Sequence, residues 1–187
     1  AYGFQLDAAT NSAVVKTISN VENVLGTTGK DYIVGSSSDN VITGGAGADV
    51  INVGDGTDTI VYSGASDTQT GVVATGFTVS GDVVLGMGNA DKINLSSLAN
   101  LVLADGAVSV GTTFATATAN EVVIVSGSYD ATTKVFTSGT ASATNNDYIL
   151  QYNSGTLSTT VNSVVLVDIV GTLSAAAAGE IITLTVA

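Results

Sequence analysis

Isoleucines recur at a strict spacing in the first third of the chain. They are Ile33, Ile42, Ile51 and Ile60, nine positions apart. Each follows an acidic or amide residue by two positions, and small residues, many of them glycine, fill the positions between. Because side chains alternate across a strand, this pattern predicts short strands with inward isoleucines, joined by tight turns. The residues just before the isoleucines should then face solvent or a partner: Tyr32, Val41, Val50 and Thr59.

The nine-residue register extends beyond these four copies and then fades. Consecutive units start at Gly26, Gly35, Gly44, Val53 and Tyr62. Upstream, one further unit keeps Glu22 at the acidic position. Downstream, the unit from Tyr62 keeps Asp67 but has Gln69 where an isoleucine is expected. The sequence therefore predicts a parallel β-roll over residues 8–70, in which two nonapeptides make one coil and residues 18 apart stack on each other.

After Gly71 the period is lost, and the pattern becomes one of ordinary strands separated by Gly, Asn and Asp clusters. Strands are predicted at 76–85, 101–110, 121–126, 134–137, 148–152, 163–170 and 181–186. Single helical turns are expected at 94–98 and 173–178. The predicted fold is therefore all-β, with the roll followed by a strand-rich β-sandwich or irregular roll over residues 71–187.

Composition narrows the chemistry. The 187 residues contain no Cys, His or Pro, and the net charge is −12. Without Cys and His there is no disulfide, no His-based catalytic site and no zinc finger, so a bound metal must be held by oxygen. The chain has no Arg, which argues against nucleic-acid binding. No apolar stretch is long enough to predict a transmembrane helix.

Stacking in the roll sorts the acidic positions into two columns. Asp31, Asp49 and Asp67 should line one edge, while Glu22, Asn40 and Asp58 should line the other. Stacked carboxylates about 5 Å apart repel each other by roughly 3 kcal/mol at an effective dielectric constant near 20. The metal-free roll should therefore be unstable, and calcium, which prefers oxygen ligands, should stabilise it.

We expect carboxylates and backbone carbonyls to share the calcium ligation. The carbonyls would come from the turns that contain Gly29, Gly45, Gly47, Gly54 and Gly56. The first edge should be the stronger site, because Asn40 lowers the charge of the second, although Asp39 and Asp55 lie close enough to compensate. About two to four ions are expected, with the Asp31–Asp49 and Asp49–Asp67 pairs favoured. Among the later acidic residues, Asp91 is the favoured calcium ligand, because Ile93 follows it by two positions as in the repeats. The alternative is a metal-free β-helix whose Asp and Asn residues only stabilise turns.

The best copy, GGAGADVIN at residues 44–52, resembles the calcium-binding nonapeptide of RTX proteins. The resemblance extends to TISNVENVL at 17–25, similar to a lead-in strand, and to NADKINLSSL at 89–98, similar to a segment that closes such rolls. Residues 180–187, EIITLTVA, resemble an uncleaved secretion signal. The resemblance implies export by the type I secretion machinery to the bacterial cell surface or medium, and folding on arrival in calcium.

The sequence is compatible with three kinds of protein that carry such repeats. Richness in Thr, Ala, Val, Ser and Gly resembles RTX-type surface-layer proteins, in which calcium also bridges subunits, so we expect self-association and no enzymatic activity in this chain. One alternative is the C-terminal module of a secreted enzyme, such as a serralysin-type protease or a lipase. The other is the terminal domain of an RTX adhesin.

Overall fold

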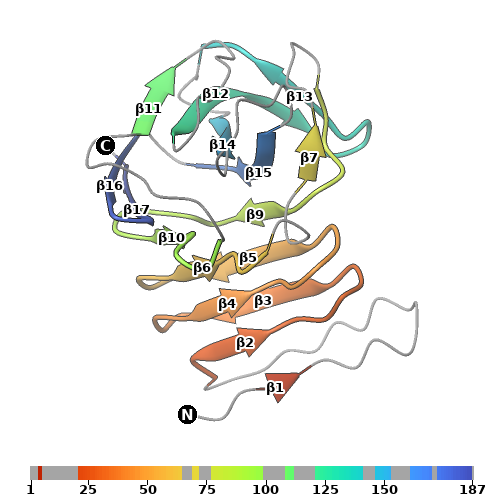
Figure 1. Ribbon diagram of the computed structural model, residues 1–187, viewed down its shortest axis with the longest axis vertical. Helices are drawn as coiled ribbons and strands as arrows, with labels where there is room; N and C mark the ends of the chain where they lie inside the picture. Colours follow the sequence, from red (N-terminus) through yellow and green to blue (C-terminus); the bar gives the residue numbers. More distant parts are fainter. Residues whose placement is uncertain are drawn as a thin grey trace.

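The computed structural model describes residues 4–5, 21–64, 69–71, 77–98, 108–111, 121–140, 146–152, 161–169 and 172–186. Within these residues every regular element is a strand, and none is a helix. The prediction of an all-β fold with a β-roll and a strand-rich second part is confirmed. Figure 1 shows the roll strands stacked one above another beneath the strands of the second part.

The roll is built from short parallel strands. They are β1 (Phe4–Gln5), β2 (Asn23–Leu25), β3 (Tyr32–Ser36), β4 (Val41–Thr43), β5 (Val50–Gly54) and β6 (Thr59–Val61). Strand β3 pairs with β5 and β4 pairs with β6, which places Tyr32 opposite Val50 and Val41 opposite Thr59. Residues 18 apart are therefore stacked, as predicted. Figure 1 shows the resulting coils along the long axis of the molecule.

After β6 the chain leaves the roll and later returns to it. Strands β7 (Gln69–Gly71) and β8 (Phe77–Thr78) pair antiparallel with strands of the second part. Strand β9 (Val83–Leu85) then pairs parallel with β5, and β10 (Lys92–Asn94) pairs parallel with β6. The predicted unit from Tyr62 therefore does not continue the stack, because its last residues belong to β7. Asp67 lies outside the described residues, and the division into domains at residue 70 stays a prediction.

The second part consists of longer, mostly antiparallel strands. They are β11 (Val108–Gly111), β12 (Val122–Asp130), β13 (Val135–Ser138), β14 (Asp147–Tyr152), β15 (Val161–Val167), β16 (Leu173–Ala178) and β17 (Ile181–Val186). They extend two sheets that begin in the roll: β9 pairs with β15, and β10 pairs with β17. One sheet runs β1-β2-β4-β6-β10-β17-β16, and the other runs β3-β5-β9-β15-β14-β12-β13-β8.

The two predicted helical turns are not helices. Residues 173–178 form β16, whose Leu173, Ala175 and Ala177 pack against the core. Its hairpin with β17 turns at Gly179, which has a φ of 59°. The hairpin overrides the helix propensity of alanine, because alternation across a strand buries every second residue. At 94–98, Asn94 belongs to β10, and a turn follows in which the Leu98 N–H donates to the Leu95 carbonyl.

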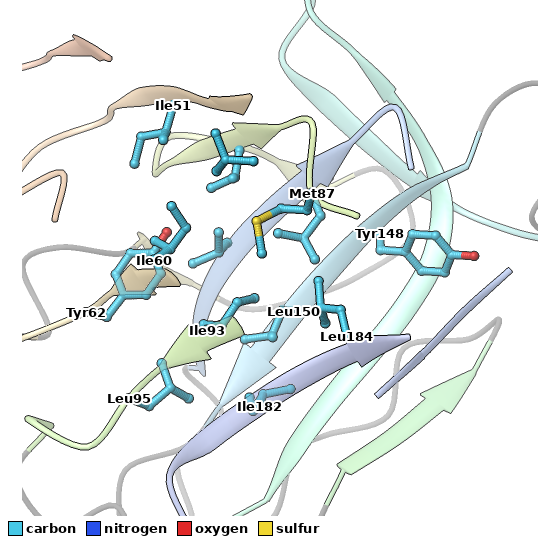
Figure 2. Packing of buried hydrophobic residues seen from close by; sticks show 14 of the residues in the cluster. Ile51, Ile60, Tyr62, Met87, Ile93, Leu95, Tyr148, Leu150, Ile182 and Leu184 are labelled. Atoms are coloured by element: carbon cyan, nitrogen blue, oxygen red, sulfur yellow. The ribbon is translucent and has the colours of Figure 1, made fainter. Parts of the chain in front are cut away.

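The main core lies between the two sheets and runs through both parts. In the roll it is a thin stack of one or two aliphatic residues per strand, and Ile42, Ile51 and Ile60 are fully buried, as predicted. Figure 2 shows this stack meeting later residues: Met87 from the turn between β9 and β10, Leu150 from β14 and Leu184 from β17. A second cluster, which includes Val125, Phe136 and Ile149, is built from strands of the longer sheet.

Candidate metal centre

Glycines at fixed positions let neighbouring turns of the roll approach each other closely. Gly45 and Gly54 have φ values of 94° and 92°, which side chains rarely permit. A Cβ on Gly45 would collide with the Thr27 carbonyl, and one on Gly54 would collide with the Ser36 carbonyl. Gly47 and Gly56 also have positive φ and lie against the turn of the preceding coil. Carbonyl oxygens are therefore packed between the turns of each edge.

The residue after each turn links its own coil to the previous one through a hydrogen-bond ladder. On the first edge, the Asp31 N–H donates to Asp49 Oδ1, and the Asp49 N–H donates to Asp82 Oδ1, each at 2.8 Å. On the second edge, the Asn40 N–H donates to Asp58 Oδ1, and the Asp58 N–H donates to Asp91 Oδ1, also at 2.8 Å. The observed columns are therefore Asp31, Asp49 and Asp82 on one edge and Asn40, Asp58 and Asp91 on the other.

At three ladder positions, a side-chain oxygen accepts from a backbone N–H of the turn just before it. Asp31 Oδ2 accepts from the Thr27 N–H at 2.6 Å, and Asp91 Oδ2 accepts from the Gly88 N–H at 2.7 Å. For Asn40, whose Nδ2 donates to the Val21 carbonyl, Oδ1 accepts from the Ser36 N–H at 2.8 Å. At these positions a backbone N–H donates to the side-chain oxygen, which needs no cation.

Asp58 lacks such a hydrogen bond. Its side chain is fully buried, and Oδ2 has no hydrogen-bond partner. The equivalent donor, the N–H four residues earlier, belongs to Gly54, and it donates to Asn52 Oδ1 at 3.2 Å instead. Burying an anionic oxygen without a partner lowers the stability of the fold by at least about 1–3 kcal/mol, and a bound cation would offset this cost.

The charges around Asp58 increase that cost. Burial and, to a smaller extent, the negative charges of Asp91, Asp39 and Asp55 together raise the pKa of Asp58 to about 6, against the lowering effect of the Asn40 N–H. Asp39 is itself held in place, because its Oδ1 accepts from the Thr57 N–H at 2.9 Å. Several negative charges of the second edge therefore act on the buried carboxylate of Asp58.

The remaining predicted ligands lie in different surroundings. Glu22 is exposed and joins the ladder only through its carbonyl, which accepts from the Val41 N–H. Asp55 is exposed in its turn, with its N–H donating to the Ser36 carbonyl. Gly29 lies beneath Gly47, so its carbonyl is among those packed between turns. Which of these residues hold calcium stays a prediction, as does the stronger rank given to the first edge.

Asp82 was not predicted as a ladder residue. Asp82 takes the third place in the first column, where Asp67 was expected, and the residues that follow Asp67, at 69–71, form β7 and pair with β15. The ladder spacing grows from 18 to 33 residues at this point, an insertion of 33 − 18 = 15. The available signal was the repeated spacing itself: Asp82 and Asp91 are nine apart, and each precedes an apolar residue by two positions, Val84 and Ile93.

The donor set fits a calcium ion. It consists only of oxygens, the glycine turns hold carbonyls at short range, and Asp58 Oδ2 is a buried anionic atom without a partner. Across the described ranges no three acidic side chains form a group that could hold a metal ion by themselves. An ion here would therefore need backbone carbonyls or water beside one or two carboxylates.

Comparison with known proteins agrees with this chemistry. Residues 25–60 match the RTX calcium-binding nonapeptide repeat in four copies. The match covers the turns and strands from Leu25 to Ile60 and supports the resemblance predicted from the sequence. It indicates calcium binding, and such repeats are typical of secreted extracellular bacterial proteins. No curated protein matches the chain. No helix in the described part of the chain is long and apolar enough to cross a membrane.

Proposed function

We propose that this chain, with its four RTX calcium-binding repeats, is a calcium-dependent folding and assembly module of a bacterial protein exported to the cell surface. The observation that carries the proposal is Asp58, a fully buried carboxylate with an unpartnered oxygen inside the matched repeats. A carboxylate that serves only to stabilise a turn would use both oxygens, as Asp91 does.

Calcium, when bound, supplies positive charge that offsets the carboxylates of the roll. Asp58 would hold it on the second edge, and Asp49 would do so on the first, with carbonyls from the glycine turns completing the ligands. Without the ion, the buried charge on Asp58 and the charges of Asp39, Asp55 and Asp91 oppose closure of the coils. The thin isoleucine stack offers little to offset that repulsion.

A roll that folds only when calcium offsets its charge repulsion is suited to export by a type I secretion machinery. A chain that stays unfolded where calcium is scarce can be transported and can then fold outside the cell. The segment that resembles a secretion signal lies in β17, where Ile182 and Leu184 are fully buried. Any machinery that reads this segment must therefore meet it before the chain folds.

We further propose a structural role without enzymatic activity, in a surface-layer or similar surface protein. Exposed apolar side chains on the outer faces of the roll support self-association, notably Leu25, Tyr32 and Val41, which are 41–48% exposed. The alternatives remain a module of a secreted enzyme and a terminal domain of an adhesin. Electron microscopy in calcium separates them: ordered sheets support the surface layer, and persistent monomers support the alternatives.

A calcium titration of metal-free protein tests the folding role. The far-UV circular dichroism spectrum should gain β signal as calcium is added and the roll becomes ordered, and magnesium at equal concentration should act much more weakly. A spectrum that does not respond to calcium would contradict the proposal.

A further inference from the structure

The turn that leads into Asp58 carries the dipeptide Asp55–Gly56. Both residues of this dipeptide are exposed, and Gly56 has a φ of 125°, a conformation that favours glycine. Within the described part of the chain, neither the Asp55 carboxylate nor the Gly56 N–H forms a hydrogen bond. A carboxyl group without a hydrogen bond therefore lies next to a backbone nitrogen that no side chain shields.

The buried ladder aspartates differ from Asp55 in both respects. The N–H of the residue after Asp49 donates to the Asp31 carbonyl at 2.9 Å, and the N–H of the residue after Asp58 donates to the Asn40 carbonyl at 2.8 Å. The following residues are a valine and a threonine, whose branched side chains hinder approach to the nitrogen. The structure thus protects these aspartates from attack by the next backbone nitrogen and leaves Asp55 open to it.

We propose that Asp55–Gly56 is a site of spontaneous isomerisation to isoaspartate, and that calcium binding by the roll suppresses this modification. In the first step the Gly56 nitrogen attacks Asp55 Cγ. The N–Cγ bond forms, and the hydroxyl of the carboxyl group leaves with the amide proton as water. In the second step water opens the resulting succinimide ring. Opening at the backbone carbonyl of Asp55 gives isoaspartate, and opening at Cγ restores aspartate.

The folded roll opposes this reaction because it anchors the turn on both sides of the dipeptide. The Asp55 N–H donates to the Ser36 carbonyl at 3.0 Å, and the Thr57 N–H donates to Asp39 Oδ1 at 2.9 Å. An atom added at Gly56 would lie 2.9 Å from a backbone carbon of the preceding turn. Because ring closure turns the backbone toward the Asp55 side chain, the turn must first leave its neighbour. Calcium slows the reaction by raising the free energy of that opening. The control by calcium rests on the proposed function, whereas the chemistry does not.

Isoaspartate at this position disturbs the second edge of the roll. The modification routes the backbone through the former side chain, which lengthens the chain by a methylene carbon. The turn has no room for a longer path, since Gly54 and Gly56 already lie against the preceding coil. The alignment in which the Asn40 N–H reaches Asp58 Oδ1 is then lost. A chain that stays without calcium for long therefore loses its ability to bind calcium later.

The test ages the full 187-residue chain at neutral pH in calcium, in a chelator and in denaturant. Peptide mapping with mass spectrometry measures isoaspartate at Asp55 and at Asp105, which precedes Gly106 in a second copy of the dipeptide and lies outside the described residues. In denaturant the two sites should react at similar rates, which sets the reference rate. In the chelator Asp55 should react within about threefold of that rate, and in saturating calcium at least about tenfold more slowly.

Equal rates at Asp55 in calcium and in the chelator, or no isoaspartate at Asp55 in the chelator, would overturn the inference. Equilibrium dialysis of fresh protein tests the proposed function separately. Fresh protein that binds no calcium would overturn that function, whatever the rate of isomerisation.

The variant D55E separates the effect of isoaspartate from general ageing, because the longer glutamate side chain closes the corresponding ring much more slowly. Wild type aged in the chelator should bind fewer calcium ions than fresh wild type, in proportion to its isoaspartate, whereas aged D55E should match fresh D55E. An equal loss in aged D55E would overturn the proposed consequence. If D55E does not fold, chromatography separates aged wild-type chains with aspartate from those with isoaspartate, and equal calcium binding by the two would overturn it instead.

Discussion

The roll and the second part of the molecule are both made of strands, yet they are held together differently. In the roll, each of the strands β2–β6 contributes one or two buried aliphatic residues, and buried acidic or amide side chains line the edges. In the second part, strands such as β14 are buried on both faces, from Asp147 to Tyr152. The second part thus has the thicker core, whereas the roll combines a thin core with several buried acidic side chains along its edges. The comparison predicts that calcium dependence originates in the roll.

Removing a core side chain should change the free energy of unfolding most. Its effect on the calcium requirement should differ between the roll and the second part. I51A and I149A each delete a fully buried isoleucine and should each cost about 3–4 kcal/mol. Only I51A should also raise the calcium concentration needed for folding, by at least about tenfold, because the roll folds with its ions. Thermal unfolding and calcium titrations measure both quantities. Equal calcium midpoints for the two variants would remove the distinction between the parts.

A glycine pair sharpens the same comparison. G45A should destabilise the calcium-loaded protein by about 2–3 kcal/mol, because alanine must adopt a positive φ and its Cβ collides with the Thr27 carbonyl. Gly139, in the second part, has open space around an added Cβ. G139A should therefore change stability by less than about 0.5 kcal/mol. Denaturant unfolding in calcium measures both, and similar costs would contradict the close stacking of the roll turns.

A change of pH should alter the stability of the metal-free protein by less than the core and glycine substitutions do. The direction should be opposite to that of common acid denaturation. The pKa of Asp58 is raised to about 6 in the folded chain, so the folded state binds more protons than the unfolded state between about pH 4 and 6. The stabilisation is present at low pH and is lost as the pH rises through about 6. Between pH 7 and 5 the metal-free protein should gain about 1–2 kcal/mol. Thermal unfolding in a chelator at the two pH values measures this, with D58N as the variant that should lose the gain.

Much of the roll could be predicted from sequence because its signals are local. The isoleucine spacing gave the inward face, and the 18-residue stacking followed from two units per coil. The re-entry could not be predicted, since it depends on β7 and β8 pairing with distant strands before β9 returns. For the same reason Asp67 was expected where Asp82 completes the ladder.

The sequence predicted which acidic residues line the roll, but not which of them lacks a hydrogen-bond partner. Asp49, Asp58 and Asp91 were named from their spacing, but nothing local distinguishes Asp58 from Asp31. The difference depends on the Gly54 N–H, which is taken by Asn52 in the structure, whereas the Thr27 N–H reaches Asp31. Similarly, the alanines of β16 favour a helix locally, and the pairing with β17 decides otherwise.

The stability of D58N with and without calcium tests the central claim most directly. Asparagine can keep the acceptor for the Asn40 N–H but removes the buried charge. In a chelator, D58N should be more stable than the wild type by about 1 kcal/mol, and in saturating calcium it should be less stable, because a calcium ligand is lost. This reversal of sign is the result that we predict. A D58N protein that is less stable than the wild type in both conditions would show that Asp58 only stabilises its turn and would contradict the account.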